Sequence, residues 1–321
     1  MTKIKAGIAG AAGYTGGELV RLLLLHPKAE IVFAQSKSQA GKFVYEVHTD
    51  LIGDTNLKFS DHISNDIDVL FLCMGHGESK KFLLEEARLS ADICIIDLSQ
   101  DFRLDKQYIY GLPELNREKI KGHRRIANPG CFATCIQLGI LPLADKHLIE
   151  NEVHIHATTG STGAGQGLAA TSHFSWRSNN LSIYKAFDHQ HLAEIGQSLK
   201  QLQPNIDTAL NFIPARGSFT RGIFASMYTD VKLSLEEAKA IYSAYYKGHP
   251  FVHISDSLTD VKQVVNTNKC ILYLEKHGDK LLITSVLDNL LKGASGQAVQ
   301  NMNLAFGLEE TMGLKLKGSA F

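Results

Sequence analysis

Residues 4–26 read IKAGIAGAAGYTGGELVRLLLLH, and this stretch decides the fold class. It opens with a short apolar strand, Ile4–Ala9, and continues through a turn that contains four glycines. It ends in a helical run, Glu18–His26, which Pro27 stops. A strand, a glycine turn and a helix in this order predict the first strand–helix–strand unit of a parallel sheet.

The same alternation of strand and helix continues over the first hundred residues. Short apolar strands are predicted at Glu30–Ala34, Asp68–Cys73 and Asp92–Leu98, with a helix at Glu78–Leu89. Buried apolar strands that alternate with helices are typical of a doubly wound parallel sheet. The first part of the chain is therefore predicted to form an α/β domain of the Rossmann type.

The second half of the chain differs from the first, because its predicted strands are longer and often alternate apolar with polar residues. A helix is predicted at Leu235–Tyr246 and another near His191–Gln201. We expect an α+β domain with a mixed or antiparallel sheet, residues 147–288, that carries catalysis and oligomerisation. A last helix, Asn289–Phe306, is expected to return to the first domain, which then comprises residues 1–146 and 289–321. The predicted strands of the second half are Glu152–Thr159, Thr208–Ile213, Gly222–Val231, Lys269–Lys276 and Lys280–Leu287.

Composition narrows the function classes. The chain has 321 residues, and 33 basic residues balance 33 acidic ones, so no basic stripe favours nucleic acid as a partner. No apolar run approaches the ~18 residues that a membrane span needs, and no signal peptide is seen. The cysteines are odd in number and scattered, which favours a reducing cytoplasm without disulfides. They are Cys73, Cys94, Cys131, Cys135 and Cys270.

Cys131 is the strongest catalytic candidate. It follows the turn Asn128-Pro129-Gly130, and an apolar, helix-compatible run follows it. The N-terminus of a helix favours the thiolate over the thiol, through its N–H groups and its dipole. A thiolate there predicts covalent catalysis on an acyl group. The alternative is a buried small hydrophobe, which is our interpretation of Cys135.

The glycine turn is the second chemical signal. Gly10, Gly13 and Gly16 lie between a strand and a helix, where backbone N–H groups can hold a pyrophosphate. A purely structural turn is the alternative. The segment after the second strand contains Ser36, Lys37 and Ser38 and no acidic residue, which favours NADP(H) over NAD.

His189 and His191 form the third signal. A neutral imidazole near Cys131 could take its proton, or give a proton to a developing oxyanion. The alternatives are a metal pair and two polar histidines at a helix start. No third ligand has a suggestive spacing, so we predict no metal site.

These segments carry a family resemblance over nearly the whole chain. GAAGYTGGE at residues 10–18, NPGCFAT at 128–134 and DHQHLAEI at 188–195 are its most specific parts. Further likeness lies in SKSQAGK at 36–42, DLSQDFR at 97–103, YGLPE at 110–114 and DNLLKGASGQ at 288–297. The chain resembles the N-acyl-γ-glutamyl-phosphate reductases of arginine biosynthesis, which are related to the aspartate-semialdehyde dehydrogenases.

The resemblance implies an NADPH-dependent reduction of an acyl phosphate to a semialdehyde, with Cys131 as nucleophile and His189 as acid and base. It also implies a homodimer or homotetramer that acts on a small molecule. The candidate substrate-binding residues are His191, Arg103, Arg221, Lys185 and Ser161, together with Arg216, which lies where the chain departs from the family pattern. The cofactor-binding residues implied are Gly10, Gly13, Tyr14, Thr15, Gly16, Ser36, Lys37, Ser38, Ser79, Gly163, Asn289 and Lys292.

One departure from the family pattern concerns the acyl group. Residues 212–222 read FIPARGSFTRG, where family members usually carry Pro-His-Leu and a second proline before Arg-Gly. Arg216 adds a cation there, which predicts acceptance of an N-succinyl as well as an N-acetyl substrate. Arg216 facing solvent or pairing with a local acid is the alternative. Two other functions stay open, an aspartate-semialdehyde dehydrogenase and a non-catalytic NADP-binding sensor.

Overall fold

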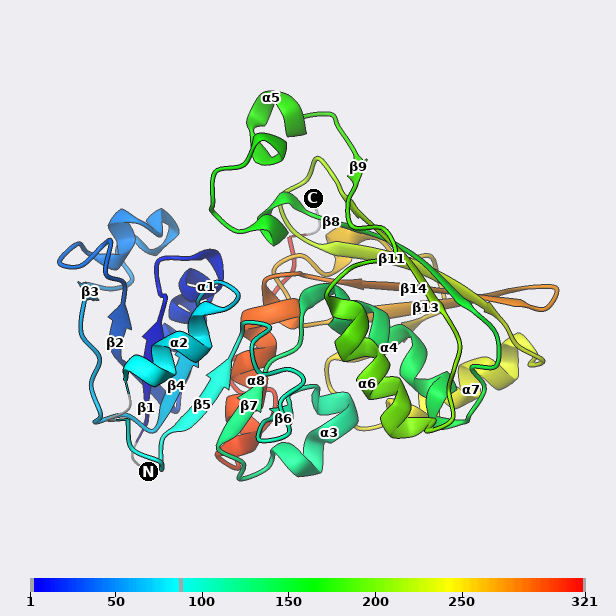
Figure 1. Ribbon diagram of the computed structural model, residues 1–321, viewed down its shortest axis with the longest axis horizontal. Coiled ribbons are helices and arrows are strands. Elements are labelled where there is room, and N and C mark those ends of the chain that lie inside the picture. The colour runs from blue at the N-terminus through cyan, green and yellow to red at the C-terminus, as the bar shows by residue number, and fades with distance from the viewer. Residues whose placement is uncertain (1–2, 87–88, 320–321) are drawn as a thin grey trace. The chain divides into compact units, whose positions relative to one another are not determined.

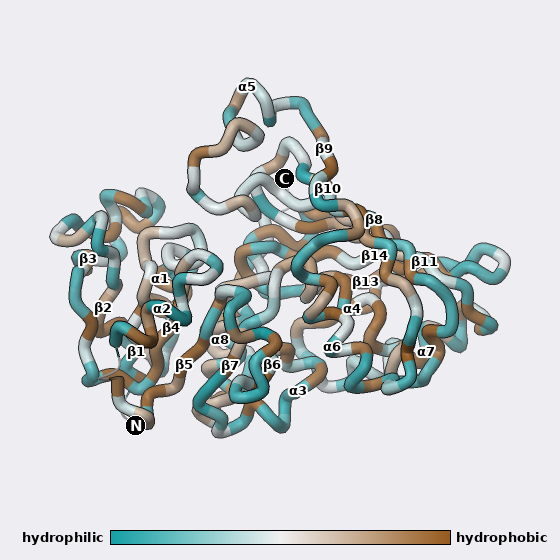
Figure 2. Tube along the Cα trace, viewed as in Figure 1, coloured by the Kyte–Doolittle hydropathy of each residue, from teal (hydrophilic) through white to brown (hydrophobic). Residues whose placement is uncertain are grey.

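The computed structural model describes residues 3–86 and 89–319, and the chain divides into two compact units. The first comprises residues 1–130 and 294–315, and the second comprises residues 131–293 and 316–321. Figure 1 shows the elements of both units. Hydrophobic residues concentrate in their strands and helices, whereas the connecting loops are mostly hydrophilic (Figure 2).

The first unit contains a parallel sheet of seven strands. Its strand order is β3-β2-β1-β4-β5-β7-β6, and every pairing is parallel. The chain winds from β1 (Ile4–Ala9) towards β2 (Ala29–Gln35) and then reverses to β4 (Val69–Leu72) on the other side of β1. The carboxyl end of β1 therefore lies at the switch point where doubly wound sheets bind ligands. The other strands are β3 (Phe59–Ser60), β5 (Cys94–Asp97), β6 (Ile109–Tyr110) and β7 (Arg125–Ala127).

Four helices accompany this sheet. They are α1 (Tyr14–Leu24), α2 (Glu78–Glu85), α3 (Pro113–Ile120) and α8 (Gly296–Ala305). All four residues of β4 and of β5, which lie in the middle of the sheet, are buried. The predicted Rossmann-type sheet is confirmed. The predicted helix Glu78–Leu89 ends at Glu85, and its residues 87–88 lie outside the described part of the chain.

The first helix begins four residues earlier than predicted, at Tyr14 instead of Glu18. Gly16 and Gly17 thus lie inside the helix although glycine disfavours helical conformation. Packing explains their presence, because a Cβ on Gly16 would lie 2.6 Å from the backbone of Ala11. A Cβ on Gly17 would lie 2.5 Å from the ring of His48.

The second unit contains a mixed sheet of seven strands in the order β12-β13-β14-β11-β8-β10-β9. The β8–β10 and β12–β13 pairs are parallel and the others are antiparallel, as predicted for an α+β domain. The strands are β8 (Val153–Thr159), β9 (Ser182–Ile183), β10 (Leu210–Arg216), β11 (Ile223–Asp230), β12 (Val252–Ser255), β13 (Cys270–His277) and β14 (Lys280–Leu287). The helices are α4 (Cys131–Asp145), α5 (Phe174–Arg177), α6 (His191–Leu202) and α7 (Leu235–Tyr245).

Helix α4 is the core element of the second unit. All thirteen residues from Phe132 to Ala144 are buried. The helix packs against α6 and the sheet, and Tyr242 and Tyr246 of the α7 region donate hydrogen bonds to the carbonyls of Gly139 and Leu138. This packing assigns α4 to the second unit, so the division falls after residue 130, whereas the sequence predicted it after residue 146.

Two further boundaries differ from the prediction. The expected single helix Asn289–Phe306 is a π-helical turn, Leu291–Ser295, followed by α8. The predicted strand Thr208–Ile213 extends instead to Arg216, because β10 pairs with both β8 and β9. Among the described residues, no helix is long and apolar enough to cross a bilayer.

Candidate active site

The glycine turn of the first unit is shaped by close backbone contacts. Gly10 directly follows β1 with φ +77°, and a Cβ there would lie 2.8 Å from the carbonyl oxygen of Cys73. Helix α1 begins at Tyr14 with Gly13 as its N-cap. A glycine-lined turn at the N-terminus of a helix is the cradle that a pyrophosphate requires, since its negative charge faces backbone N–H groups.

Three side chains that the sequence analysis did not select brace this turn. The Oε1 of Gln35 accepts a hydrogen bond from the N–H of Gly10 (3.3 Å), and His48 donates to the carbonyl of Ala11 (2.9 Å). Ser295 donates to the carbonyl of Thr15 (2.8 Å). Nothing in the spacing of these residues marks them, because their positions depend on tertiary packing.

The segment that follows β2 fits a phosphate-bearing nucleotide. Ser36 is buried and its hydroxyl lies 3.5 Å from that of Ser38, whereas Lys37 is exposed. Lys37 makes no ion pair among the described residues. Ser79 is fully buried in the first turn of α2. Hydroxyls and an uncompensated ammonium are suited to a 2′-phosphate, as predicted from the acid-free sequence.

The turn before Cys131 is held by buried polar contacts of the first unit. The side chain of Arg103, only 6% exposed, donates to the carbonyls of Asn128 (3.0 Å) and Leu98 (3.2 Å). The side chain of Asn128 contacts Asn301 and the carbonyl of Ala294, each at 3.0 Å. Arg103, predicted to bind substrate, thus braces the turn that leads to the nucleophile.

Cys131 is the first residue of α4 and is partly exposed, whereas the next thirteen residues are buried. Its sulfur therefore lies at the positive end of a 15-residue helix, which favours the thiolate. A Cβ on Gly293 would lie 2.9 Å from the Cβ of Cys131. A side chain at position 293 would therefore collide with Cys131.

An aromatic cluster places both histidines beside the residue after Cys131. The Phe132 ring stands edge-on to the rings of His189 (5.6 Å between centroids) and Phe212 (5.3 Å), and His191 lies 6.3 Å away. The two imidazoles are 4.5 Å apart and both residues are buried. The structure thus brings the predicted histidines to the start of α4, beside the residue that follows Cys131.

Hydrogen bonding distinguishes the two imidazoles. The backbone N–H of His191 donates to Nδ1 of His189 (3.2 Å), so Nδ1 carries no proton and a neutral His189 holds its proton on Nε2. Nε2 of His191 lies 3.9 Å from a carboxylate oxygen of the buried Glu194. His189 is therefore set up as a donor through Nε2, and His191 is accompanied by an acid.

Tyr184 lies between the histidines and Arg216. Its ring is 5.8 Å from that of His189, and the guanidinium of Arg216 lies over its face at 4.8 Å. Burial and the nearby charge of Cys131 raise the pKa of Tyr184 to about 12, so its hydroxyl stays protonated. Tyr184 offers the site a neutral hydrogen-bond donor.

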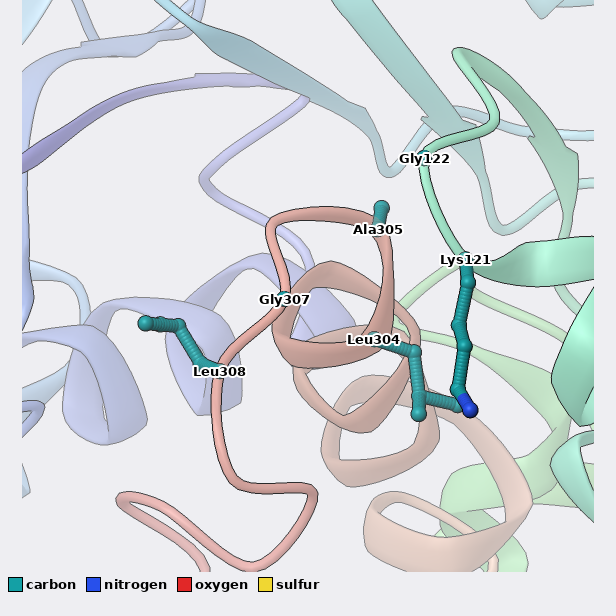
Figure 3. A pocket seen from close by; sticks show the side chains of 6 residues that line it. All are labelled: Lys121, Gly122, Leu304, Ala305, Gly307 and Leu308. Atoms are coloured by element: carbon teal, nitrogen blue, oxygen red, sulfur yellow. The ribbon is translucent and has the colours of Figure 1, made fainter.

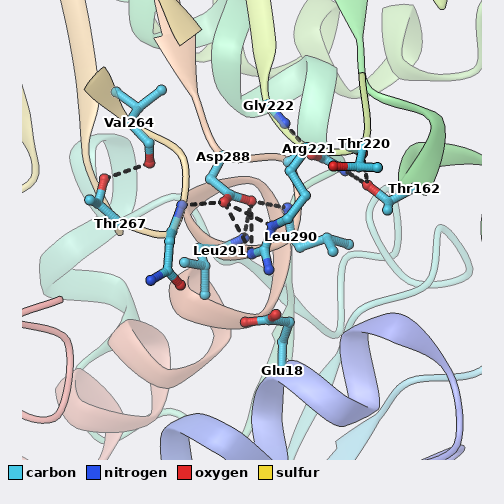
Figure 4. A network of polar contacts seen from close by, with 12 residues as sticks. Glu18, Thr162, Thr220, Arg221, Gly222, Val264, Thr267, Asp288, Leu290 and Leu291 are labelled. Atoms are coloured by element: carbon cyan, nitrogen blue, oxygen red, sulfur yellow. Dashed lines mark hydrogen bonds and ion pairs between the residues drawn. The ribbon is translucent and has the colours of Figure 1, made fainter. Parts of the chain in front are cut away.

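The other predicted cations have different surroundings. Arg221 makes a two-pronged contact with the fully buried Asp288, from Nε to Oδ2 (3.1 Å) and from Nη2 to Oδ1 (3.2 Å). Figure 4 shows this contact within a wider polar network. The ammonium of the exposed Lys185 lies 3.3 Å from Oε1 of Gln190. The charge of Arg221 is thus balanced by the protein itself.

Of the predicted cofactor residues of the second unit, Asn289 forms part of the same network. Asn289 accepts a hydrogen bond from the N–H of Gly222 (2.7 Å) and donates to Thr162 (3.0 Å). Ser161 and Gly163 flank Thr162 in a short 3₁₀ turn after β8. Lys292 is fully buried, with its ammonium 5.9 Å from the centre of the Phe251 ring.

A separate cavity of about 370 Å³ lies in the first unit, between the end of α3 and the end of α8 (Figure 3). It is lined by Lys121, Gly122, Leu304, Ala305, Gly307 and Leu308. None of the predicted site residues lines this cavity. No cluster of metal-ligating side chains occurs within residues 3–86 and 89–319.

The chain matches two known domain families, and solved proteins share its fold. Residues 5–123 match the family described as "Semialdehyde dehydrogenase, NAD binding domain", and residues 131–289 match "Semialdehyde dehydrogenase, dimerisation domain". The solved aspartate semialdehyde dehydrogenase II of Vibrio cholerae shares the fold, with a TM-score of 0.76 and 17% identity over 95% of this chain and 98% of that one. An aspartate semialdehyde dehydrogenase with NADP from Candida albicans gives a TM-score of 0.68 and 15% identity, over 94% of this chain and 98% of that one. The class is that of the semialdehyde dehydrogenases.

Curated relatives are much closer in sequence. A Bacteroides thetaiotaomicron N-acetyl-gamma-glutamyl-phosphate reductase is 60% identical, over 99% of this chain and all of the relative. One from Christiangramia forsetii is 58% identical over the same shares. The chain belongs to the N-acetyl-gamma-glutamyl-phosphate reductase family, which confirms the resemblance found in its motifs.

Proposed function

We propose that the protein reduces an N-acyl-γ-glutamyl phosphate to the N-acyl-glutamate 5-semialdehyde and phosphate, with NADPH, as a step of arginine biosynthesis. The observation that carries the proposal is the partly exposed Cys131 at the start of a helix whose following thirteen residues are buried. The relatives' names state this substrate class and this reaction type. A thiolate in this position forms thioesters readily.

The chain's own residues account for the covalent steps. The sulfur of Cys131 attacks the acyl carbon, the bond from that carbon to the phosphate oxygen breaks, and a thioester forms. The Nε2–H of His189 donates a hydrogen bond to the oxyanion that develops on the acyl carbon, and the departing phosphate takes up a proton from water. After reduction by the hydride that bound NADPH would supply, the tetrahedral adduct on sulfur collapses to the aldehyde and frees the thiolate. Tyr184 donates a hydrogen bond to the substrate.

The nucleotide is assigned to the residues that fit it. Gly10, Gly13 and Gly16 with the start of α1 would hold the pyrophosphate, and Ser36 and Lys37 would hold the 2′-phosphate. When bound, NADPH supplies the hydride that reduces the thioester. The remaining predicted cofactor residues are Tyr14, Thr15, Ser38, Ser79, Gly163, Asn289 and Lys292. A catalytic thiolate needs a reducing compartment, so we place the reaction in the cytoplasm.

Replacement of Cys131 by serine tests the function. Oxidation of N-acetyl-glutamate semialdehyde with phosphate and NADP should fall by at least ~10²-fold, because a serine hydroxyl stays protonated at neutral pH. Binding of NADPH, measured by fluorescence titration, should not change. Cys94→Ala is the matched control, since Cys94 is buried in β5 and far in sequence from the site. A Cys131→Ser enzyme that keeps more than about a tenth of its rate would refute the nucleophile.

Aspartate semialdehyde serves as the second substrate in that assay. The alternative of an aspartate-semialdehyde dehydrogenase predicts turnover of this smaller aldehyde, and we expect none. A non-catalytic sensor would turn over neither aldehyde while still binding NADPH.

We further propose that the protein is a homodimer or homotetramer that assembles through its second unit. The match of residues 131–289 to a dimerisation domain supports this assembly. Large apolar side chains are exposed on the segment between β8 and β10, among them Leu168, Phe174 at 80% and Ile183 at 63%. Light scattering should give at least twice the monomer mass, and a monomer would refute the assembly.

A further inference from the structure

Two arginines lie side by side in the second unit without an acidic partner. Arg177 at the end of α5 donates through Nη1 to the backbone carbonyl of Arg216 (2.5 Å). No carboxylate among the described residues lies within ion-pair distance of either side chain. A pair of cations without a counter-charge is unfavourable unless an anion compensates it.

The guanidinium of Arg177 is held by hydrogen bonds within the second unit. It is 6% exposed and donates to the carbonyl of Thr171 through both Nε and Nη2 (3.1 Å each) and to the hydroxyl of Ser182 (3.3 Å). Burial and the charge of Arg216 lower the pKa of its guanidinium. Its role is to fix the segment before β9 and the end of β10, and it adds a positive field there.

The side chain of Arg216 hydrogen-bonds to Tyr184, but not all of its donors are satisfied. Its Nε is buried and has no hydrogen-bond partner, and its guanidinium rests on the Tyr184 ring. Because side chains alternate along a strand, Arg216 shares a face of β10 with Phe212, which packs against Phe132 and His189. The guanidinium therefore belongs to the side of the sheet that carries the nucleophile.

A series of contacts leads from the start of α4 to Arg216, which is its last member. Phe132 next to Cys131 contacts His189, His189 contacts Tyr184, and Tyr184 carries Arg216 on its face. The acyl phosphate reacts at Cys131, so the part of the substrate that reaches furthest from the reacting carbon lies nearest Arg216. In an N-acyl-glutamyl substrate that part is the end of the acyl arm.

We propose that Arg216 binds a carboxylate at the end of the substrate's N-acyl group, so that the preferred acyl group is that of a dicarboxylic acid such as succinate. This inference rests on the proposed function. A guanidinium presents a planar fork that matches a carboxylate, and stacking on Tyr184 holds the fork in place. An acetyl group has no terminal carboxylate with which the guanidinium could pair.

The test compares three aldehydes in the same oxidation assay: N-succinyl-, N-succinamoyl- and N-acetyl-glutamate 5-semialdehyde. The succinamoyl group ends in an amide and matches the succinyl group in size without its charge. In the wild type, kcat/KM should be about 10- to 150-fold higher for the succinyl than for the succinamoyl substrate. Arg216→Ala should remove this difference and leave the acetyl substrate within about threefold, and Arg216→Lys should restore part of it.

The outcomes distinguish a failure of this inference from a failure of the proposed reductase function. Turnover of the acetyl substrate with none of the succinyl one would overturn the inference and leave the reductase function intact. An equal loss on all three substrates in Arg216→Ala would also overturn it, because Arg216 would then bind the α-carboxylate that they share. No turnover of any aldehyde would instead refute the proposed function.

A second measurement needs no variant in this region. N-Succinyl-L-glutamate should inhibit the wild-type enzyme competitively with a Ki at least tenfold below that of N-acetyl-L-glutamate. Lys200→Ala, which removes an exposed cation from α6, is the control for a general change of charge and should leave the ratio unchanged. Equal inhibition by the two compounds would contradict the assignment of Arg216.

Discussion

Replacement of Asp288 by asparagine should destabilise the second unit strongly. The carboxylate of Asp288 is fully buried and accepts from Arg221 and from the backbone N–H groups of Asn266 (2.7 Å) and Leu290 (2.8 Å). Asparagine keeps the size but loses the charge, and it turns one acceptor into a donor that faces other donors. The change therefore removes the carboxylate that forms the two-pronged contact with the guanidinium of Arg221.

The size of the effect follows from the burial of the two partners. Removal of one partner of a buried ion pair typically costs about 3–5 kcal/mol. The side chain of Arg221 is 21% exposed, so water can solvate part of its charge. We therefore expect the lower end of the range, about 3 kcal/mol.

Trp176 provides the assay, because it is the only tryptophan of the chain and lies in α5 of the second unit. Its fluorescence during urea unfolding should report the loss of stability in Asp288→Asn. A double-mutant cycle with Arg221→Gln should give a coupling of about 1–3 kcal/mol. A loss below about 1 kcal/mol, or additive effects in the cycle, would refute the structural pairing. If Arg221→Gln has normal stability but a raised KM, then Arg221 binds the substrate and does not stabilise the fold.

Three further changes test the nucleotide turn and the core of the first unit. Ser36→Asp should shift the kcat/KM ratio towards NADH by at least about tenfold, because a carboxylate repels a 2′-phosphate; an unchanged ratio would contradict the site. Gly16→Ala should weaken NADPH in a fluorescence titration, because the new Cβ would lie 2.6 Å from Ala11, and unaltered affinity would contradict this. Burial lowers the pKa of His26, so the unfolded chain binds the proton more readily and the melting temperature should fall as the pH drops below about 6.5. His26→Gln should flatten this decline, and an identical slope in the variant would rule out His26 as its source.

The sequence predicted those parts of the fold whose signals are local and repeated. Apolar strands such as β4 and β5 and long strands such as β13 and β14 show their periodicity directly. Strands of two or three residues, among them β3, β6 and β9, have no room for a period and were not predicted. They form because neighbouring strands offer hydrogen-bonding edges.

The residues of the candidate site also fall into two groups: those marked by a local sequence signal and those whose role depends on tertiary contacts. A turn followed by an apolar run marks Cys131, and the strand–turn–helix order marks Gly10 and Gly13, since both signals are contiguous in sequence. Arg103 and Arg221 show what residue type alone cannot predict, because the structure pairs the one with backbone carbonyls and the other with Asp288. An arginine near a motif predicts a cation, but only tertiary contacts decide whether that charge remains available to a ligand.

Arg216 illustrates this limit most clearly. The sequence marks it as an unusual cation, yet its availability depends on Arg177, which lies 39 residues earlier in a stretch without periodicity. Had an acid occupied the place of Arg177, Arg216 would be neutralised and the acyl arm would meet no charge. Because the neighbour is a second arginine already bound to carbonyls, the positive charge of Arg216 is left for the substrate. The acyl preference that we propose thus depends on a contact between α5 and β10 that no local pattern encodes.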